Sequence, residues 1–465
     1  MKIHIKLFII IALGFFSLTA QAQYDQTLYN LREYTPFGHS LNPSSFPDAG
    51  SYLLLPLHFQ TYVSTGFSLN DLYRKQSEGK LYGSLEYLLG NINRGIYSAS
   101  GYQMPVLGVG SRINHKHFFS LDMSIKSRIA FNVPRGMLKF LSQGNVDENS
   151  NIINHEFESL HLNGTVYGEI SAGFGTKINE KLQVGLRLKY LWGIANIYGD
   201  IDSRLVTNDD YSINLKTNEE TTVYTSGLLA LLDDDESEYS DAGEYALAGK
   251  NNGFAIDLGA TYQLDENIKL SASLIDLGYI SWKDDLKSNR LPEGVEFLGS
   301  DLDRLLEVRK KYSDGYFDFV SDSLKNKYDV VEGKDKYTTW LHGKLYINGS
   351  YDYNRFLTFG STLAGTAVSG EIHTAISLYT TLHLGRCFHL NTNYSYQNGS
   401  FANWGAGFVF TPGPFQLYVA TDNILPSMKP EIARAVDLRF GLNLIFGKRK
   451  YYRKKAKMSS TLLEN

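Results

Sequence analysis

The chain has 465 residues, and 45 Lys and Arg against 49 Asp and Glu give it a formal net charge of -4, a size that suits two or three ordinary domains or one large closed sheet. Beyond the first twenty residues it has no apolar run of the roughly 20 residues that a membrane-spanning helix needs, which excludes a helical transporter. Its single cysteine, Cys387, excludes a disulfide framework and a metal cluster held by thiolates.

Residues 1–22 have the pattern of an export signal. Lys2 and Lys6 precede an apolar stretch, Leu7 to Leu18, and Ala20-Gln21-Ala22 is a small-x-small cleavage site before Gln23. The stretch is too short for a membrane anchor, and no cysteine follows it as in a lipoprotein. We therefore expect cleavage near Ala22 and export from the cytoplasm.

Fourteen segments between residues 51 and 446 alternate apolar and polar side chains and end at turn residues, as β-strands do. They cover 51–66, 102–113, 117–131, 158–177, 181–198, 253–264, 267–282, 337–352, 355–366, 371–384, 387–397, 401–411, 414–422 and 435–446. Tight turns follow every even-numbered strand up to the twelfth, whereas long connections of 67–101, 132–157, 199–252 and 283–336 follow strands one, three, five and seven. Short turns at one rim and long loops at the other are typical of outer-membrane barrels, with the short side in the periplasm.

The faces of these strands support a membrane barrel. In the last strand Val436, Leu438 and Phe440 share a face opposite Asp437 and Arg439. A soluble sandwich also shows such alternation, but these strands are long enough for a tilted bilayer crossing, and aromatic residues gather near their ends. We expect an all-β fold: a 14-stranded antiparallel transmembrane β-barrel over residues 51–446, with short helices in long extracellular loops.

Charged residues on the polar faces would lie in the lumen. They are Glu169, Arg187, Lys189, Asp257, Lys269, Lys344 and Arg439. Because charges kept off the lipid face must lie inside, and opposite signs occur on neighbouring strands, structural ion pairing is favoured over a ligand site.

The long loops carry the helix-like patterns, at 81–92 and 302–324, where apolar residues recur at intervals of three and four. The acidic run 233–236 has carboxylates that suit Ca²⁺, but it lacks the spacing of an EF-hand. We therefore expect a solvated loop, with no metal or cofactor site.

Residues 447–465 form a basic tail, with seven positive charges and no negative charge between Lys448 and Lys457. At the periplasmic rim such a tail can bind anionic lipid headgroups or a periplasmic protein partner. Binding to nucleic acid is implausible after export.

The stretches 182–196 and 253–262, together with Leu41-Asn42-Pro43 and Asp276-Leu277-Gly278, resemble a family of Bacteroidota outer-membrane barrels of unknown function. That family is related to fourteen-stranded long-chain fatty-acid transporters (FadL-type) and to PorV-type barrels. The resemblance implies the outer membrane of a Gram-negative bacterium, and it suggests that residues 23–50 fold back into the lumen as a plug; a periplasmic leader is the alternative.

Catalysis finds little support in the sequence. A barrel phospholipase needs a serine and a histidine within hydrogen-bond reach, and His342, His373 and His389 occur in strands, but the chain has no G-x-S-x-G, no H-E-x-x-H and no Gly-rich phosphate loop. We therefore expect no enzyme.

Two functions remain open. A conduit for small hydrophobic or amphipathic molecules predicts an apolar pocket within the barrel and a hydrophobic ligand. A non-conducting scaffold, a partner barrel of an envelope or protein-secretion machine, predicts a filled lumen and an exposed apolar patch on the loops for a periplasmic or outer-membrane protein partner. Both readings place membrane lipids around the barrel.

Overall fold

The computed structural model describes residues 24–447, except 48, 65, 76–80, 93–94, 146–150, 208–212, 218–220, 229–241, 292–295, 299–330, 369–370 and 398–399. The expected export signal, the helix at 302–324, the acidic run 233–236 and the basic tail beyond 447 lie outside the described residues.

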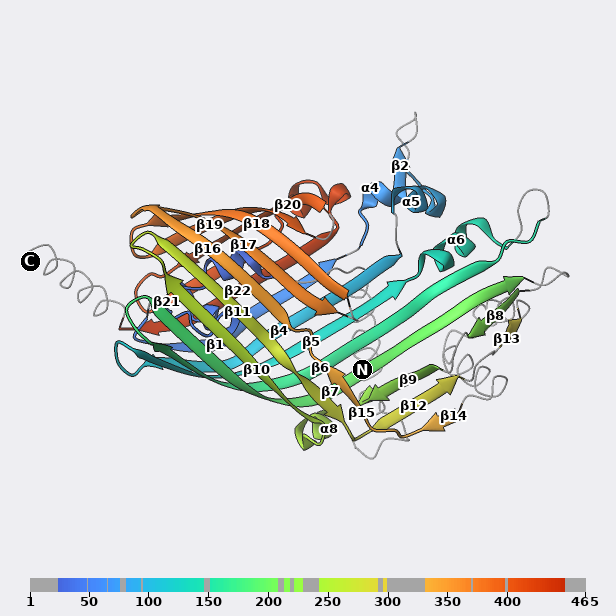
Figure 1. The fold of residues 1–465 in the computed structure, drawn as a ribbon, viewed down its shortest axis with the longest axis horizontal. Coiled ribbons are helices and arrows are strands. Elements are labelled where there is room, and N and C mark those ends of the chain that lie inside the picture. The colour runs from blue at the N-terminus through green and yellow to red at the C-terminus, as the bar shows by residue number, and fades with distance from the viewer. Residues whose placement is uncertain are drawn as a thin grey trace, which may run out of the picture.

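Fourteen strands form a closed antiparallel barrel (Figure 1). They are β1 (Ser51–Ser64), β4 (Ile96–Arg112), β5 (His117–Val133), β6 (His155–Lys177), β7 (Leu182–Thr207), β10 (Asn252–Gln263), β11 (Ile268–Trp282), β16 (Lys344–Asn354), β17 (Leu357–Val368), β18 (Glu371–Leu384), β19 (Phe388–Gln397), β20 (Ser400–Phe410), β21 (Phe415–Thr421) and β22 (Ala435–Phe446). Each pairs with the next in this order, and β22 pairs with β1, so the ring closes. The predicted 14-stranded barrel is confirmed, and closure satisfies the backbone hydrogen bonds of these strands within the sheet.

The outer face of the barrel is apolar. On β22, Val436 and Phe446 are 53% and 49% exposed, whereas Arg439 on the inner face is 1% exposed. Four outward aromatic residues are neighbours across β7, β10, β11 and the short strand that follows: Tyr190, Phe254, Tyr279 and Trp340. Apolar bands edged with aromatic residues are the surface that a bilayer covers.

The long connections contain short elements at one end of the barrel (Figure 1). They are α4 (Leu69–Leu72), β2 (Tyr73–Lys75), β3 (Leu81–Gly83), α5 (Leu85–Asn91), α6 (Arg135–Gln143), β8 (Ile213–Thr217), β9 (Thr221–Ser226), α8 (Ala242–Ala248), β12 (Leu286–Leu291), β13 (Glu296–Leu298), β14 (Val331–Gly333) and β15 (Tyr337–Trp340). A further helix, α11 (Leu425–Met428), and a 3-10 helix, Pro430–Ile432, connect β21 to β22. None of the helices in the described part of the chain is long and apolar enough to cross a membrane.

Three strands differ clearly from their predicted extent. β4 begins at Ile96, six residues before the predicted start at 102. β7 continues past the predicted end at residue 198 to Thr207, because its far half pairs with β8 and β9, which lie in a long loop. The eighth predicted strand is divided into β15 and β16 at residues 341–343. Opposite this break Asp276 of β11 has a φ of 60°, so the strand bulges and turns the Asp276 carboxylate inward.

Residues 24–47, which we call the inner segment, lie inside the barrel. The segment contains α2 (Gln26–Asn30), whose residues are all buried, and α3 (Gly38–Leu41). Leu28, Tyr29 and Phe37 pack against inward residues of the wall such as Tyr346 and Tyr418. The chain then leaves the segment at the short-turn rim, where Gly50 N donates to Phe446 O at 2.8 Å.

Candidate functional site in the barrel lumen

The middle of the inner segment packs on a row of glycines. Gly175, Gly185 and Gly259 are direct neighbours across β6, β7 and β10. The turn at 42–44 lies on this row so closely that a Cβ at Gly185 or Gly259 would overlap its backbone. Three successive strands without side chains here therefore form a flat surface that only glycine provides.

The turn itself is built from its own sequence. The Asn42 side-chain oxygen accepts hydrogen bonds from Ser44 N at 3.0 Å and from Ser44 Oγ at 2.7 Å, as an Asx turn requires. Ser44 Oγ lies 2.7 Å from Thr261 Oγ1 on β10. The turn is thus preformed, and it is joined to the wall through one hydroxyl pair beside the glycine row.

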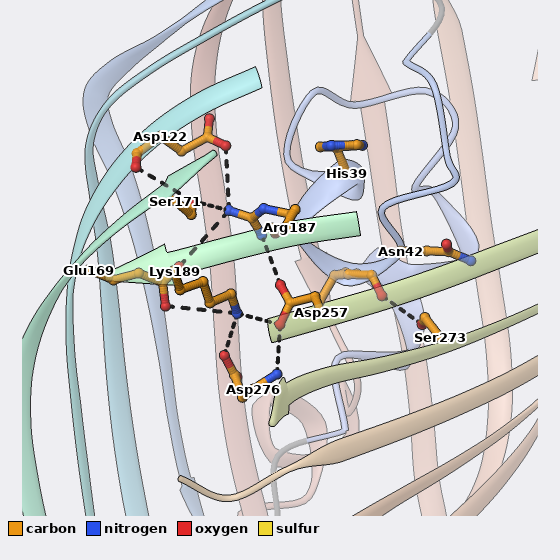
Figure 2. A network of polar contacts seen from close by, with 12 residues as sticks. His39, Asn42, Asp122, Glu169, Ser171, Arg187, Lys189, Asp257, Ser273 and Asp276 are labelled. Carbon is orange, nitrogen blue, oxygen red and sulfur yellow. Dashed lines mark hydrogen bonds and ion pairs between the residues drawn. The ribbon is translucent and has the colours of Figure 1, made fainter. Parts of the chain in front are cut away.

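Seven charged side chains converge beside the inner segment, and we call them the lumen charge cluster: Asp122, Lys126, Glu169, Arg187, Lys189, Asp257 and Asp276. Figure 2 labels all of them except Lys126. Lys189 Nζ lies 2.7 Å from Asp257 Oδ1 and 2.5 Å from Asp276 Oδ1. Arg187 reaches Asp122 at 3.4 Å and Asp257 at 3.5 Å. Four carboxylates therefore surround three cations in a buried site, where an unpaired charge would be costly.

The cluster contains four of the seven charges that the sequence placed in the lumen, namely Glu169, Arg187, Lys189 and Asp257. It also contains three that sequence reasoning missed. Asp122 and Lys126 share the inward phase of β5 with Ser124, opposite the exposed Leu121 and Met123, so strand alternation would have found them. Asp276 gave no such signal, since the bulge in β11 changes the phase of the strand.

The remaining predicted charges contact the inner segment itself. Asp25 accepts hydrogen bonds from Arg439 Nε at 2.7 Å and from Lys344 Nζ at 2.8 Å. Lys269 Nζ lies 2.7 Å from a carboxylate oxygen of Glu33. Burial raises the pKa of Asp25, but Lys344 and Arg439 outweigh it and lower this pKa to about 2. The predicted ion pairing is therefore partly a set of contacts between the wall and the inner segment.

The wall also caps the first helix of the inner segment. Asp422 accepts hydrogen bonds from Gln26 N at 3.2 Å and Thr27 N at 2.7 Å, which supplies the free N–H groups of the first turn of α2 with a carboxylate. Arg439 Nη2 donates to the same carboxylate at 3.1 Å. Sequence reasoning could not assign this role, because the cap comes from the far end of the chain.

His39, in α3 of the inner segment, lies near Arg187 of the lumen charge cluster (Figure 2). Its Nδ1 donates to Ser45 O at 3.2 Å, and its ring meets Phe118 edge-on at 4.9 Å. Burial, with the neighbouring positive charge of Arg187, lowers the pKa of His39 to about 3. His39 is therefore neutral at physiological pH.

A cavity of about 720 Å³ lies between the inner segment and the short turns. Its lining is largely polar and charged, and includes Glu33, Lys269, Asp352, Arg355, His383 and Arg386. An apolar groove of about 500 Å³ lies instead on the outer face, where Leu186 and Leu258 line it. The cavity beside the inner segment, which we call the chamber, is thus not the apolar pocket expected of a conduit for purely hydrophobic molecules. Among the described residues, no group of three or more His, Cys, Asp and Glu side chains is placed to hold a metal ion.

Residues 43–422 match the model of a family of unknown function, DUF5723. The chain belongs to this family. The match begins at Pro43 in the turn on the glycine row and ends at Asp422, the cap of α2. No curated protein matches this DUF5723 chain.

Several solved structures are similar to this DUF5723 protein. The toluene transporter TbuX of Ralstonia pickettii has 11% identity and a TM-score of 0.41, with 89% of this chain and 95% of that chain covered. A FadL homologue of Pseudomonas aeruginosa has 8% identity and a TM-score of 0.43, with coverage of 92% and 97%. The toluene transporter TodX of Pseudomonas putida has 10% identity and a TM-score of 0.40, with coverage of 92% and 97%. At these identities the likeness concerns the fold.

Proposed function

We propose that this protein is a gated transporter of the outer membrane of a Gram-negative bacterium, in which the inner segment is a movable plug. Its cargo is a small hydrophobic or amphipathic molecule. The observation that carries the proposal is that one segment occupies the lumen on a flat glycine row, with a chamber of about 720 Å³ between it and the short turns. A barrel of fourteen strands is wider than the eight-stranded barrels that their own side chains fill.

The contacts of the inner segment support a plug that can leave its seat. Many of them are hydrogen bonds and ion pairs, such as those of Asp25, Glu33 and Ser44. Water can replace a hydrogen bond at a net cost of about 0.5–1.5 kcal/mol, or about 1.5–3 kcal/mol where one partner is charged. The glycine row adds no side chains that interlock with the turn. The segment can therefore move without breaking the strand pairs that close the barrel.

The position of the chamber indicates which compartment lies beyond the plug. The chamber adjoins short turns such as 264–267 and 385–387, and the short turns of an outer-membrane barrel face the periplasm. Release of the inner segment would join this chamber to the lumen on its far side. In this account the lumen charge cluster holds one wall of the passage in place, and no catalytic step is assigned to it.

The proposal is tested by reconstituting the purified protein in planar bilayers and in liposomes. Openings that conduct ions, or uptake of a small hydrophobic or amphipathic probe into liposomes above that of protein-free vesicles, support the transporter. A barrel that stays silent in both assays and is recovered from membranes with a stoichiometric protein partner contradicts it, and would favour the scaffold.

A further inference from the structure

A row of short hydroxyl and amide side chains crosses the inner wall. It runs in direct strand register through Thr261, Ser271, Asn348, Thr362, Ser377, Ser395 and Asn403, on β10, β11 and β16 to β20. Each is at most 6% exposed. We call these residues the hydroxyl–amide row. Each of these seven adjacent strands thus carries, at the same register of the lumen, one uncharged side chain that can form hydrogen bonds.

The inner segment follows the first part of this row. Ser44 meets Thr261 at 2.7 Å, and Arg32 donates to Ser271 at 2.9 Å and to Asn348 at 3.1 Å. Thr362 donates to Asn30 Oδ1 at 2.8 Å. Four consecutive members of the row are therefore engaged by polar groups of the plug, whose main positive charge here, Arg32, would leave with it.

The row continues past the last of these hydrogen bonds, onto β18, β19 and β20. Ser377 and Ser395 are direct neighbours and are each 1% exposed, yet neither hydroxyl has a hydrogen-bond partner among the described residues. Asn393 Oδ1, two residues before Ser395 on β19, also has no partner within the described part of the chain. Buried polar groups are normally satisfied, so these atoms are suited to a molecule that both donates and accepts hydrogen bonds.

The chemistry of the row selects against charge. Hydroxyl and amide groups offer donors and acceptors together, as the hydroxyl groups of a sugar do. A carboxylate only accepts, and β17 to β20, which carry Thr362, Ser377, Ser395 and Asn403, contain no Lys or Arg to compensate the loss of its hydration. Release of the inner segment would take Glu33 from Lys269 and Asp25 from Lys344, but these two lysines lie on β11 and β16.

We infer that the hydroxyl–amide row is the binding track of the cargo, and that the cargo presents an uncharged face rich in hydroxyl groups, either as a free sugar or as the head group of an amphipathic molecule. This inference rests on the proposed transport function; a hydroxyl-rich head group narrows the amphipathic cargo proposed above, and a free sugar would replace it. When the inner segment leaves, the cargo takes over its hydrogen bonds with Thr261 to Thr362 and adds bonds to Ser377 and Ser395.

The test compares two solutes that differ chiefly in charge. Uptake of glucose and of gluconate is measured in proteoliposomes that carry the full chain, both as wild type and with Gly185→Leu to weaken the plug seat. We expect glucose to enter at least about fivefold faster than gluconate. The double variant Ser377→Ala/Ser395→Ala should lower glucose uptake about fivefold, since two hydrogen bonds are lost. Thr374→Ala, on the exposed outer face of the same strand, should leave it unchanged.

Competition separates the two sources of the head group. Stronger inhibition of glucose uptake by octyl glucoside, below its critical micelle concentration, than by methyl glucoside assigns an amphipathic cargo, and equal inhibition assigns a free sugar. Ion conductance with equal entry of gluconate, or with glucose uptake unaffected by the double variant, overturns this inference and leaves the transporter standing. A barrel that passes neither ions nor solutes overturns both.

Discussion

Asp25 and Arg439 are 414 positions apart in the chain, yet the Asp25 carboxylate accepts a hydrogen bond of 2.7 Å from Arg439 Nε inside the barrel. Arg439 lies on β22, the strand that closes the ring against β1. Lys344 Nζ binds the other oxygen of Asp25 at 2.8 Å. The first described residues of the chain are thus held by the last strand, so the seat of the plug is complete only when the barrel has closed.

Replacing Asp25 by Asn should loosen the plug. The change leaves Lys344 and Arg439 without this carboxylate in a buried site, and breaking a buried ion pair costs about 3–5 kcal/mol. Hydrogen exchange of residues 24–47 should rise at least tenfold in Asp25→Asn. Glu431→Gln, at an exposed position, is the matched control. Equal protection in both variants would show that Asp25 does not hold the segment.

The glycine row should tolerate no side chain. In Gly185→Leu the new side chain overlaps the backbone of Pro43, so we expect faster exchange of residues 24–47 and more frequent channel openings. In Gly365→Ala the new Cβ has only an ordinary contact with His373 O, at 3.9 Å, so this variant should behave as wild type. Unchanged protection in Gly185→Leu would contradict the seat.

The strands could be predicted because alternation is a local property of the sequence. Alternation predicted the apolar outer face of β22 and the inward-facing positions of Arg187, Lys189 and Asp257. The partners of these side chains are not local. Asp276 joins the lumen charge cluster through a bulge that no pattern around residue 276 shows, and the far half of β7 forms a strand because it pairs with loop strands.

The inner segment was the least predictable part of the fold. Residues 24–47 have no strand or helix period, since their side chains follow the shape of the lumen and not a repeating face. Asp422 as a cap of α2 and Arg439 as a partner of Asp25 depend on contacts across nearly the whole chain. The resemblance suggested a plug, but the residues that seat it were visible only in three dimensions.

Acid should weaken the plug seat through His39. Its pKa is about 3 in the seated state, against about 6.5 for an exposed histidine. The seated state therefore has its full stability above pH 6.5 and loses it as pH falls toward 3, by up to about 1.4 kcal/mol per unit. Asp25, with its pKa lowered to about 2, adds a loss only below about pH 4.

The measurement is hydrogen exchange of residues 24–47 between pH 7 and pH 4.5, corrected for the intrinsic pH dependence of exchange. Protection should fall with pH in the wild type, and the slope should be about one proton smaller in His39→Gln, whatever the level of protection in that variant. The same slope in both proteins would show that His39 does not cause the pH dependence.

The lumen charge cluster should stabilise the wall. Arg187→Gln leaves Asp122 and Asp257 without the guanidinium that reaches both, and we expect a loss of about 3–5 kcal/mol in the free energy of unfolding. Arg187→Lys keeps the charge but not the two-sided geometry, so its loss should be smaller. Urea unfolding in lipid vesicles measures both, and a fully stable Arg187→Gln protein would show that the cluster is dispensable.

A reversible disulfide between the plug and the barrel wall gives the most direct test of whether the plug moves. Ser44 and Thr261 touch through their side chains, so Ser44→Cys/Thr261→Cys, in a Cys387→Ser background, should form a disulfide between the inner segment and β10. Single-channel recording should show no openings under oxidising conditions and openings within the same bilayer after addition of dithiothreitol. Equal conductance in the oxidised and reduced states, with the disulfide verified by mass spectrometry, would contradict a plug that moves to open the barrel.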